Sequence, residues 1–326
     1  MSPKHILIID TDPGVDDALA LMLAAYSPEI ELLGLTTIFG NVSVEQATKN
    51  AGFLVSLMPK PVPVAKGAAR PLVNELHPYP DFVHGVNGFG DITVQYPADF
   101  QPVAQSAAEF IVEQVNARPG EITLVPVGPL TNIALALRLD PGIATKVKKL
   151  VIMGGAVYRG GNVSPAAEAN IWNDTHAAQV VFSADWPIVM VGLDVTHDTV
   201  MLEARMNAAC AHSPKVGVFL SKICEFYAKF YRNTAGFDGF CVHDPATIVQ
   251  ILRPDLFVTQ RGQIEVVTEG LASGKTLFGP TGFMYAEAGW GKRTNVEVCT
   301  RVDGEGVLKV IEDVLKTLPD AIPNKT

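Results

Sequence analysis

The stretch Ile6-Leu7-Ile8-Ile9-Asp10-Thr11-Asp12-Pro13-Gly14-Val15-Asp16-Asp17, followed at once by Ala18-Leu19-Ala20-Leu21, decides the fold. Its four successive apolar residues, 6–9, predict a buried strand of a parallel sheet. Pro13 and Gly14 predict a turn, and the Ala- and Leu-rich residues from Asp16 onward predict a helix. We therefore expect the chain to begin with a strand–turn–helix unit.

Four carboxylates in this stretch predict a metal site. Asp10 and Asp12 are two residues apart on the strand and are expected to point to the same side, whereas Asp16 and Asp17 fall in the first helical turn. A helix N-terminus stabilises an acidic side chain by only about 0.3–1 kcal/mol, which does not offset the repulsion among four anions. Because Ca²⁺ and Mg²⁺ accept several carboxylate oxygens, a hard divalent cation is favoured over the alternative of a helix cap with solvated charges.

The rest of the chain alternates strands with helices. Strands are expected at 30–38, 62–65, 122–126, 149–153, 187–193, 263–267 and 295–300, and helices at 43–57, 103–117, 175–182 and 305–318. This alternation predicts an α/β fold with a parallel sheet, right-handed crossovers and ligands at the carboxyl ends of the strands. No internal repeat or clear linker divides the sequence, so a single domain is expected.

Composition excludes several classes of protein. The 326 residues are 48% hydrophobic and 18% charged, which suits a large buried core, and the net charge of -9 argues against a nucleic-acid partner. The four cysteines show no CxxC spacing, which argues against a zinc site or a disulfide framework. The chain enters a strand directly and no apolar run reaches the roughly 18 residues of a membrane span, so we expect no signal peptide, no membrane partner and a cytoplasmic protein.

Amide and carboxylate side chains follow two of the predicted strands. Asn41 comes just after strand 30–38, where a turn residue is an equally good interpretation. Asn162, Glu168 and Asn170 follow strand 149–153 without apolar periodicity, and such groups suit a hydroxyl-rich ligand because they give and accept hydrogen bonds. A polar surface loop ahead of helix 175–182 is the alternative.

Two histidines and two tyrosines are further candidates. His84 lies in a long Pro- and Gly-rich segment, 67–101, of the kind that forms binding loops, although a lone loop histidine is usually exposed. His243 precedes Asp244 at a predicted helix start and can supply a proton donor beside a carboxylate ligand. Tyr227 and Tyr231 belong to an aromatic stripe that is either core or a stacking wall for a planar ring.

Several motifs in the sequence resemble those of one known family. Asp10-Thr-Asp12-Pro-Gly-Val-Asp16-Asp17-Ala is similar to the N-terminal signature of the inosine/uridine-preferring nucleoside hydrolases. Five further motifs occur in the family's order: Thr36-Thr-Ile-Phe-Gly-Asn41, Val125-Pro-Val-Gly-Pro-Leu-Thr-Asn132, Ile152-Met-Gly-Gly-Ala156, Glu168-Ala-Asn170 and His243-Asp244-Pro245. The resemblance covers essentially the whole chain and implies one domain, residues 1–326, built around an open, mostly parallel sheet flanked by helices.

The resemblance also implies an activity and its residues. The family hydrolyses the N-glycosidic bond of ribonucleosides with a bound Ca²⁺, which implies a role in nucleoside salvage or catabolism, and its members are commonly homodimers or homotetramers. Carried over, Asp12, Asp17 and Asp244 would bind Ca²⁺ with their carboxylates and Val127 with its carbonyl. Asp12 would also be the general base, and His243, titrating near neutrality, would protonate the leaving base. The remaining substrate contacts would come from Asp16, Asn41, Asn162, Glu168 and Asn170 at the ribose hydroxyls, Met153 against the sugar, Asp244, and His84, Tyr227 and Tyr231 around the nucleobase, with Asp10 behind the site.

The sequence departs from the family's pattern at one loop, and two other functions are alternatives. Val86-Asn87-Gly88-Phe89 follows His84 where many members carry an acidic residue before the glycine, so the purine or pyrimidine preference is not predicted. A haloacid-dehalogenase-type phosphatase also begins with a strand and an Asp-x-Asp turn, but Pro13 and the Asp16-Asp17 pair fit it poorly. A calcium-dependent nucleoside- or sugar-binding protein on the same fold would bind without turnover.

Overall fold

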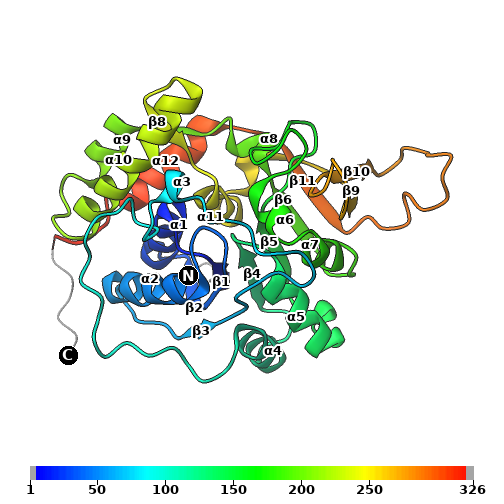
Figure 1. Cartoon of the computed structure of the whole chain (residues 1–326), viewed down its shortest axis with the longest axis horizontal. Coiled ribbons are helices and arrows are strands. Elements are labelled where there is room, and N and C mark those ends of the chain that lie inside the picture. The colour runs from blue at the N-terminus through cyan, green and yellow to red at the C-terminus, as the bar shows by residue number, and fades with distance from the viewer. Residues whose placement is uncertain (1–4, 321–326) are drawn as a thin grey trace.

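The computed structural model describes residues 5–320, which form one nine-stranded sheet in the order β10-β9-β11-β6-β5-β4-β1-β2-β3 (Figure 1). Strands β11 to β3 are parallel neighbours, and β9 is antiparallel to both β10 and β11. The strands are β1 (His5–Thr11), β2 (Ile30–Thr37), β3 (Val64–Lys66), β4 (Ile122–Pro126), β5 (Lys149–Met153), β6 (Ile188–Val191), β9 (Phe257–Val266), β10 (Thr276–Pro280) and β11 (Val296–Val302). The predicted fold class, an α/β protein with an open, mostly parallel sheet in a single domain, is confirmed; residues 1–4 and 321–326 of the predicted domain lie outside the described residues.

Helices cover both faces of the sheet and enclose two hydrophobic cores (Figure 1). One core is closed by α1 (Val15–Tyr26), α2 (Val44–Leu57), α9 (Glu203–Cys210), α10 (Val216–Ala235), α11 (Asp244–Leu252) and α12 (Gly304–Leu315). The other is closed by α4 (Ala107–Ala117), α5 (Thr131–Leu139) and α7 (Thr175–Phe182). On β1, Leu7 and Ile9 enter the first core and Ile8 the second, which is why this central strand is apolar on both sides.

The structure corrects several predicted boundaries. Helix α4 begins at Ala107 because the Ser106 side chain and Glu109 form a capping box, whereas Val103, predicted to be helical, bridges to Ala65 beside β3. Strand β6 ends at Val191, and the one-turn helix α8 (Leu193–Thr196) follows it. The one-turn helix α3 (Asp81–His84), the short α6 (Ala169–Asn173) and the two-stranded sheet of β7 (Val200–Leu202) and β8 (Gly239–Cys241) were not predicted, because each is too short for a periodic signal. Strand β10 was not predicted either, because it ends in Gly279-Pro280, a pair that is typical of turns.

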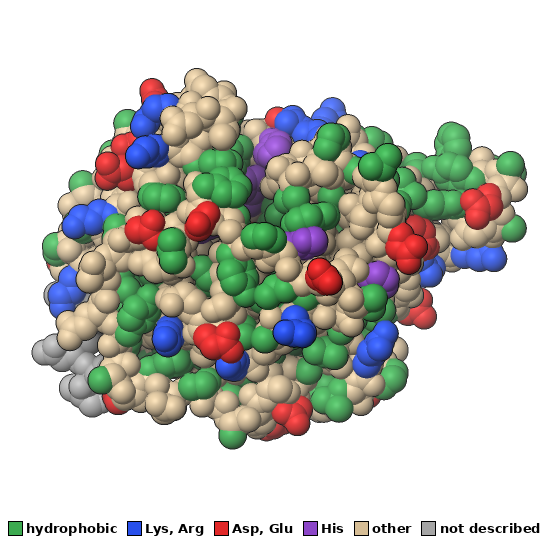
Figure 2. Space-filling model, viewed as in Figure 1, with side chains coloured by type: hydrophobic (Ala, Val, Ile, Leu, Met, Phe, Trp, Pro, Cys, Tyr) green, Lys and Arg blue, Asp and Glu red, His purple; other side chains and the backbone are tan. Residues whose placement is uncertain are grey.

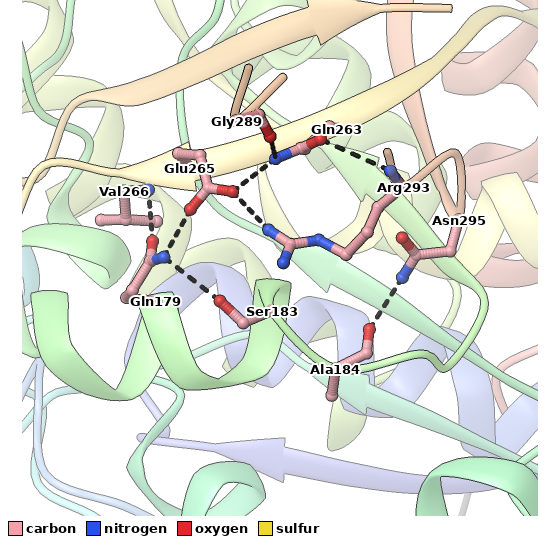
Figure 3. Close-up of polar contacts among 9 residues, drawn as sticks. All are labelled: Gln179, Ser183, Ala184, Gln263, Glu265, Val266, Gly289, Arg293 and Asn295. Carbon is pink, nitrogen blue, oxygen red and sulfur yellow. Dashed lines mark hydrogen bonds and ion pairs between the residues drawn. The ribbon is translucent and has the colours of Figure 1, made fainter. Parts of the chain in front are cut away.

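The antiparallel edge of the sheet is joined by a polar network of its own (Figure 3). The Arg293 guanidinium pairs with the Glu265 carboxylate, which also accepts a hydrogen bond from the Gln263 amide at 2.6 Å. The Asn295 amide donates to the Ala184 carbonyl at 2.8 Å. This network fixes the start of β11 after the connection from β10, residues 281–294, which projects from the molecule (Figure 1).

The charged side chains, the helices and the cysteines are distributed as follows. On the face in Figure 2, Lys and Arg side chains are scattered among acidic ones and form no continuous basic patch. Among residues 5–320, no helix combines the length and the apolar character that crossing a membrane requires. All four cysteines are buried and unbridged in the described part of the chain.

Candidate active site

A cluster of buried carboxylates lies at the carboxyl end of the sheet. Asp16 and Asp17 occupy the first turn of α1, and Asp244 begins α11, whose N-terminus is packed against α1. One carboxylate oxygen from each of these three residues lies within 4.8 Å of the other two. Asp12 follows the last residue of β1 and is also buried. Two segments that are more than 220 residues apart in sequence therefore meet at one group of acidic side chains.

The carboxylate of Asp12 is held with one oxygen left over. Its Oδ2 accepts a hydrogen bond from the backbone N–H of Asn41 at 2.6 Å, whereas Oδ1 is buried and has no hydrogen-bond partner among the described residues. Two glycines make room for this side chain, because a Cβ on Gly40 would lie 2.0 Å from Oδ2 and one on Gly128 would lie 2.5 Å from Oδ1. A buried, unpartnered carboxylate oxygen is costly unless a ligand completes it.

Asp17, in contrast, accepts hydrogen bonds at both of its oxygens. Its Oδ1 accepts from the Thr11 hydroxyl at 2.6 Å, and its Oδ2 accepts from the Gly14 backbone and the Asn41 side-chain amide, each at 2.9 Å. The last bond places Asn41 in the site through both its backbone and its side chain. The turn after β1 is thus locked against the turn after β2 by carboxylate oxygens.

Burial and mutual repulsion raise the pKa values of the cluster. Desolvation, followed by the charge of Asp17, raises the pKa of Asp16 to about 8 and that of Asp12 well above its ordinary value. Desolvation also raises the pKa of Asp244, and the charged neighbours that raise it further are the carboxylates Asp16, Asp17, Asp12 and Glu168. Such a set of anionic oxygens fits a hard divalent cation, which would relieve both the repulsion and the unpartnered Asp12 oxygen.

Asp10 lies behind this cluster, and other groups hold only one of its oxygens, since its Oδ2 is buried and, like Oδ1 of Asp12, has no hydrogen-bond partner among the described residues. Its Oδ1 accepts hydrogen bonds from the Thr36 hydroxyl at 2.6 Å and from the Asn132 amide at 2.7 Å. Desolvation raises its pKa to about 7, and these two hydrogen bonds act in the opposite direction. Of the four aspartates in the first stretch of sequence, Asp10 lies outside the acidic cluster. Asp244, from far along the chain, is the fourth member of that cluster.

The predicted ribose-side residues converge from β4, β5 and α6. The Asn170 side-chain amide donates to the Val127 carbonyl at 2.8 Å and to the Met153 carbonyl at 3.2 Å. Glu168 is buried, and its Oε2 accepts from the Gly155 backbone N–H at 2.9 Å. Asn162 lies on the exposed loop before α6, where its Oδ1 accepts from the Ala169 backbone N–H at 3.0 Å. The structure thus brings all of these residues to the same end of the sheet.

His84 is buried rather than exposed, unlike a typical loop histidine. The backbone N–H of Val15 donates to its Nδ1 at 3.2 Å, so the contact assigns the ring proton to Nε2. Its ring stacks on Tyr227 with centroids 5.4 Å apart. Burial lowers the pKa of His84 to about 3, which keeps the imidazole neutral.

His243 lies between two hydroxyl groups. Its Nε2 is 2.8 Å from the Tyr231 hydroxyl, and its Nδ1 is 2.8 Å from the Thr196 hydroxyl. The expectation that His243 titrates near neutrality is wrong, because burial, assisted by His197 and His84, lowers its pKa to about 3. In the metal-free protein this imidazole is neutral and acts through hydrogen bonds.

Of the two roles that the sequence left open for Tyr227 and Tyr231, the structure shows the core role. Both are buried members of the hydrophobic core on α10, with ring centroids 5.2 Å apart, and each contacts one of the site histidines. The sequence interpretation missed Thr196, Gly40 and Gly128 as parts of the site. Gly40 and Gly128 lie in the turns that follow β2 and β4, and Thr196 ends α8, which follows β6. This placement was the only signal, since the carboxyl ends of parallel strands meet at one edge.

Comparisons with known proteins agree with this geometry. Residues 7–309 match the sequence profile described as inosine-uridine preferring nucleoside hydrolase. The chain is 42% identical to uridine nucleosidase 1 of Arabidopsis thaliana over 308 residues, which cover 94% of this chain and 91% of that protein. Among solved structures, a plant nucleoside hydrolase superposes with a TM-score of 0.92 at 37% identity, covering 97% of this chain and 100% of that one. A purine-preferring ribonucleoside hydrolase from Gardnerella vaginalis superposes with a TM-score of 0.90 at 33% identity, covering 97% and 99%.

Proposed function

The chain belongs to the inosine-uridine preferring nucleoside hydrolase family and is a nucleoside N-ribohydrolase, and we propose that it hydrolyses ribonucleosides to free base and ribose with a Ca²⁺ ion held by its acidic cluster. The observation that carries the proposal is the buried Asp12 carboxylate, with one oxygen unpartnered, beside three further buried aspartates. Membership of the family removes the phosphatase alternative.

The proposed ligands of the cation are the carboxylates of Asp12, Asp17 and Asp244 and the carbonyl of Val127. All four offer oxygen, which is the donor that Ca²⁺ prefers. The Val127 carbonyl already accepts from Asn170, and its second lone pair remains for the cation. When bound, Ca²⁺ would supply the positive charge that makes water a nucleophile near neutral pH.

Asp12 is the proposed general base. Its environment favours uptake of a proton, since desolvation and the neighbouring carboxylates raise its pKa. The Asn41 N–H fixes one of its oxygens, so the other is free to accept the proton of the attacking water. Water then adds to the anomeric carbon as the N-glycosidic bond breaks and the bonding pair leaves with the base.

The ribose hydroxyls are the proposed partners of Asp16, Asn41, Asn162, Glu168 and Asn170, with Met153 against the sugar. Carboxylate and amide groups at several fixed positions bind and orient a sugar, and orientation of this kind contributes several kcal/mol to catalysis. Asp16 and Glu168 are both buried, so their bonds to hydroxyls form in a medium of low dielectric constant.

The leaving base is the proposed ligand of His84, His243, Tyr227 and Tyr231. Both histidines are neutral in the structure, so neither brings a positive charge to the departing base. His84 can donate from its Nε2, whereas His243 can donate from Nε2 when the base takes the place of the Tyr231 hydroxyl there. The Tyr231 hydroxyl on His243 offers a route by which that ring regains its proton. One relative is named for uridine and another for purine nucleosides, so assays with both kinds of nucleoside measure the base preference of this chain.

We further propose that the protein acts in nucleoside salvage or catabolism, in the cytoplasm, as a homodimer or homotetramer. The composition and the resemblance support these proposals.

The test is ribose release from inosine, uridine, cytidine and adenosine, by the wild type and by Asp12→Ala in parallel. Release by the wild type that is abolished in the variant supports the proposal and reports the base preference. No release from any of the four in the presence of Ca²⁺ would contradict it, and nucleoside binding without release would support the binding-protein alternative.

A further inference from the structure

The connection from β5 to α6, residues 154–168, leads directly into the proposed ribose-binding residues. It contains Asn162 and ends at Glu168, which is the N-cap of α6. Gly155 in this connection donates its backbone N–H to Glu168 Oε2 at 2.9 Å. The path of residues 155–159 therefore decides where the donor that orients Glu168 lies.

Asp194 holds the N–H side of this segment. It is buried in the one-turn helix α8, and its two oxygens accept the successive backbone N–H groups of Val157, Tyr158 and Arg159 at 2.8, 2.7 and 3.1 Å. Consecutive N–H groups that converge on an anion form a nest, and hydrogen bonds to a charged acceptor are about twice as strong as neutral ones.

Lys275 holds the C=O side of the same segment. Its Nζ donates to the carbonyls of Ala156, Val157 and Arg159 at 2.7, 3.1 and 3.4 Å, which matches the three donors of an ammonium group. The neighbouring Thr276 hydroxyl accepts from the Ala156 N–H at 3.1 Å and donates to its carbonyl at 2.8 Å. One short stretch of backbone is thus fixed by an anion on one side and a cation on the other.

We propose that Asp194 and Lys275 are positioning residues that clamp residues 156–159 and thereby keep Glu168 in its ribose-binding orientation. The proposal rests on the proposed function of the site. The clamp connects the ribose-binding residues to α8 and to the residue that precedes β10. Neither of these contributes a predicted ribose ligand.

The matched control is Asp174. Its carboxylate is likewise buried and accepts three hydrogen bonds, from the Leu72 N–H and the Thr131 hydroxyl at 2.8 Å and from the Ala177 N–H at 2.9 Å, but none from residues 154–168. Asp174→Asn therefore perturbs a carboxylate of the same kind outside the clamp. An effect that comes only from lower stability would appear in both Asp194→Asn and Asp174→Asn.

The experiment measures kcat/KM for the best nucleoside substrate and for its 2′-, 3′- and 5′-deoxy analogues. Glu168→Gln identifies the hydroxyl that depends on Glu168, because discrimination against that analogue falls. We expect Asp194→Asn and Lys275→Met to lose discrimination at the same hydroxyl, with kcat/KM for the full riboside about tenfold lower or more. Asp174→Asn, at a similar decrease in Tm, keeps the discrimination of the wild type.

Two results would overturn the clamp while leaving the proposed function in place. One is a loss of rate that is equal for the riboside and all its analogues in Asp194→Asn and Lys275→Met. The other is unchanged kinetics in both. If Asp194→Asn does not fold, Lys275→Met, whose side chain is only partly buried, decides alone. Inactivity of the wild type on every riboside would overturn the clamp and the proposed function together.

Discussion

Two regions of the molecule hold carboxylates in opposite ways. At the antiparallel edge of the sheet, Glu265 is paired with Arg293 and also bound by the amides of Gln179 and Gln263 (Figure 3). At the carboxyl end of β1, none of the ion pairs found within residues 5–320 involves an aspartate of the acidic cluster. Glu265 thus has a cation from the protein itself, whereas the clustered aspartates have none among the described residues, which supports the proposed metal ion.

The largest expected effect comes from Asp12→Asn. The amide keeps the size of the side chain but cannot take up a proton, so ribose release is expected to fall by about 10³-fold or more. Steady-state release with saturating Ca²⁺ measures this loss.

Asp10→Asn is the matched control, because the new amide oxygen still accepts from Thr36 and Asn132. Its rate is expected to stay within about tenfold of the wild type. Equal losses in the two variants would mean that Asp12 has no role in the reaction beyond that of Asp10, which lies behind the site.

His243→Gln should slow the reaction by about 10- to 100-fold, since the side chain can no longer direct its N–H to the leaving base as the imidazole does. The effect should vanish for p-nitrophenyl riboside, whose leaving group departs as a stable anion. A loss of the same size on both substrates would show that His243 acts on something other than the leaving group.

Removal of the cation should reverse the usual effect of pH on stability. The folded-state pKa values of the clustered aspartates are raised above the ordinary value of 3.8, to about 8 for Asp16, so the folded metal-free protein binds more protons than the unfolded chain between these values. The contribution of these aspartates to the free energy of unfolding is therefore largest below about pH 4, and it falls as pH rises toward 8.

Thermal unfolding in a chelator should show a Tm at pH 8 at least about 3 °C lower than at pH 6, and saturating Ca²⁺ should abolish the difference. A chelated protein whose Tm rises with pH over this range would contradict the account of the cluster.

The smallest effect is expected at the other region. Arg293→Met removes the cation from a half-buried ion pair and should cost about 1 kcal/mol of the free energy of unfolding, with kcat/KM unchanged. Denaturant unfolding and ribose release measure the two quantities. A loss of activity in this variant would mean that the antiparallel edge is coupled to the site.

The first stretch of sequence predicted β1, its turn and α1, because four apolar residues before Pro and Gly leave few alternatives. The alternation of strands and helices also predicted that Asn41, Glu168 and Asn170 lie at one end of the sheet, because each follows a parallel strand. The protonation of His243 could not be predicted, since its pKa depends on burial between α8 and α10 and on His197 and His84, which are distant in sequence. Nor could the hydrogen bonds of Asp194 and Lys275 be predicted, because backbone groups are their partners and these leave no mark on residue type.

The most direct test of the account is ribose release by exhaustively chelated protein before and after Ca²⁺ is restored. We predict loss of activity on chelation and its recovery on addition of about one equivalent of Ca²⁺ per chain, bound with the affinity of a carboxylate site. Full activity in protein shown to be free of metal would contradict the assignment of the acidic cluster.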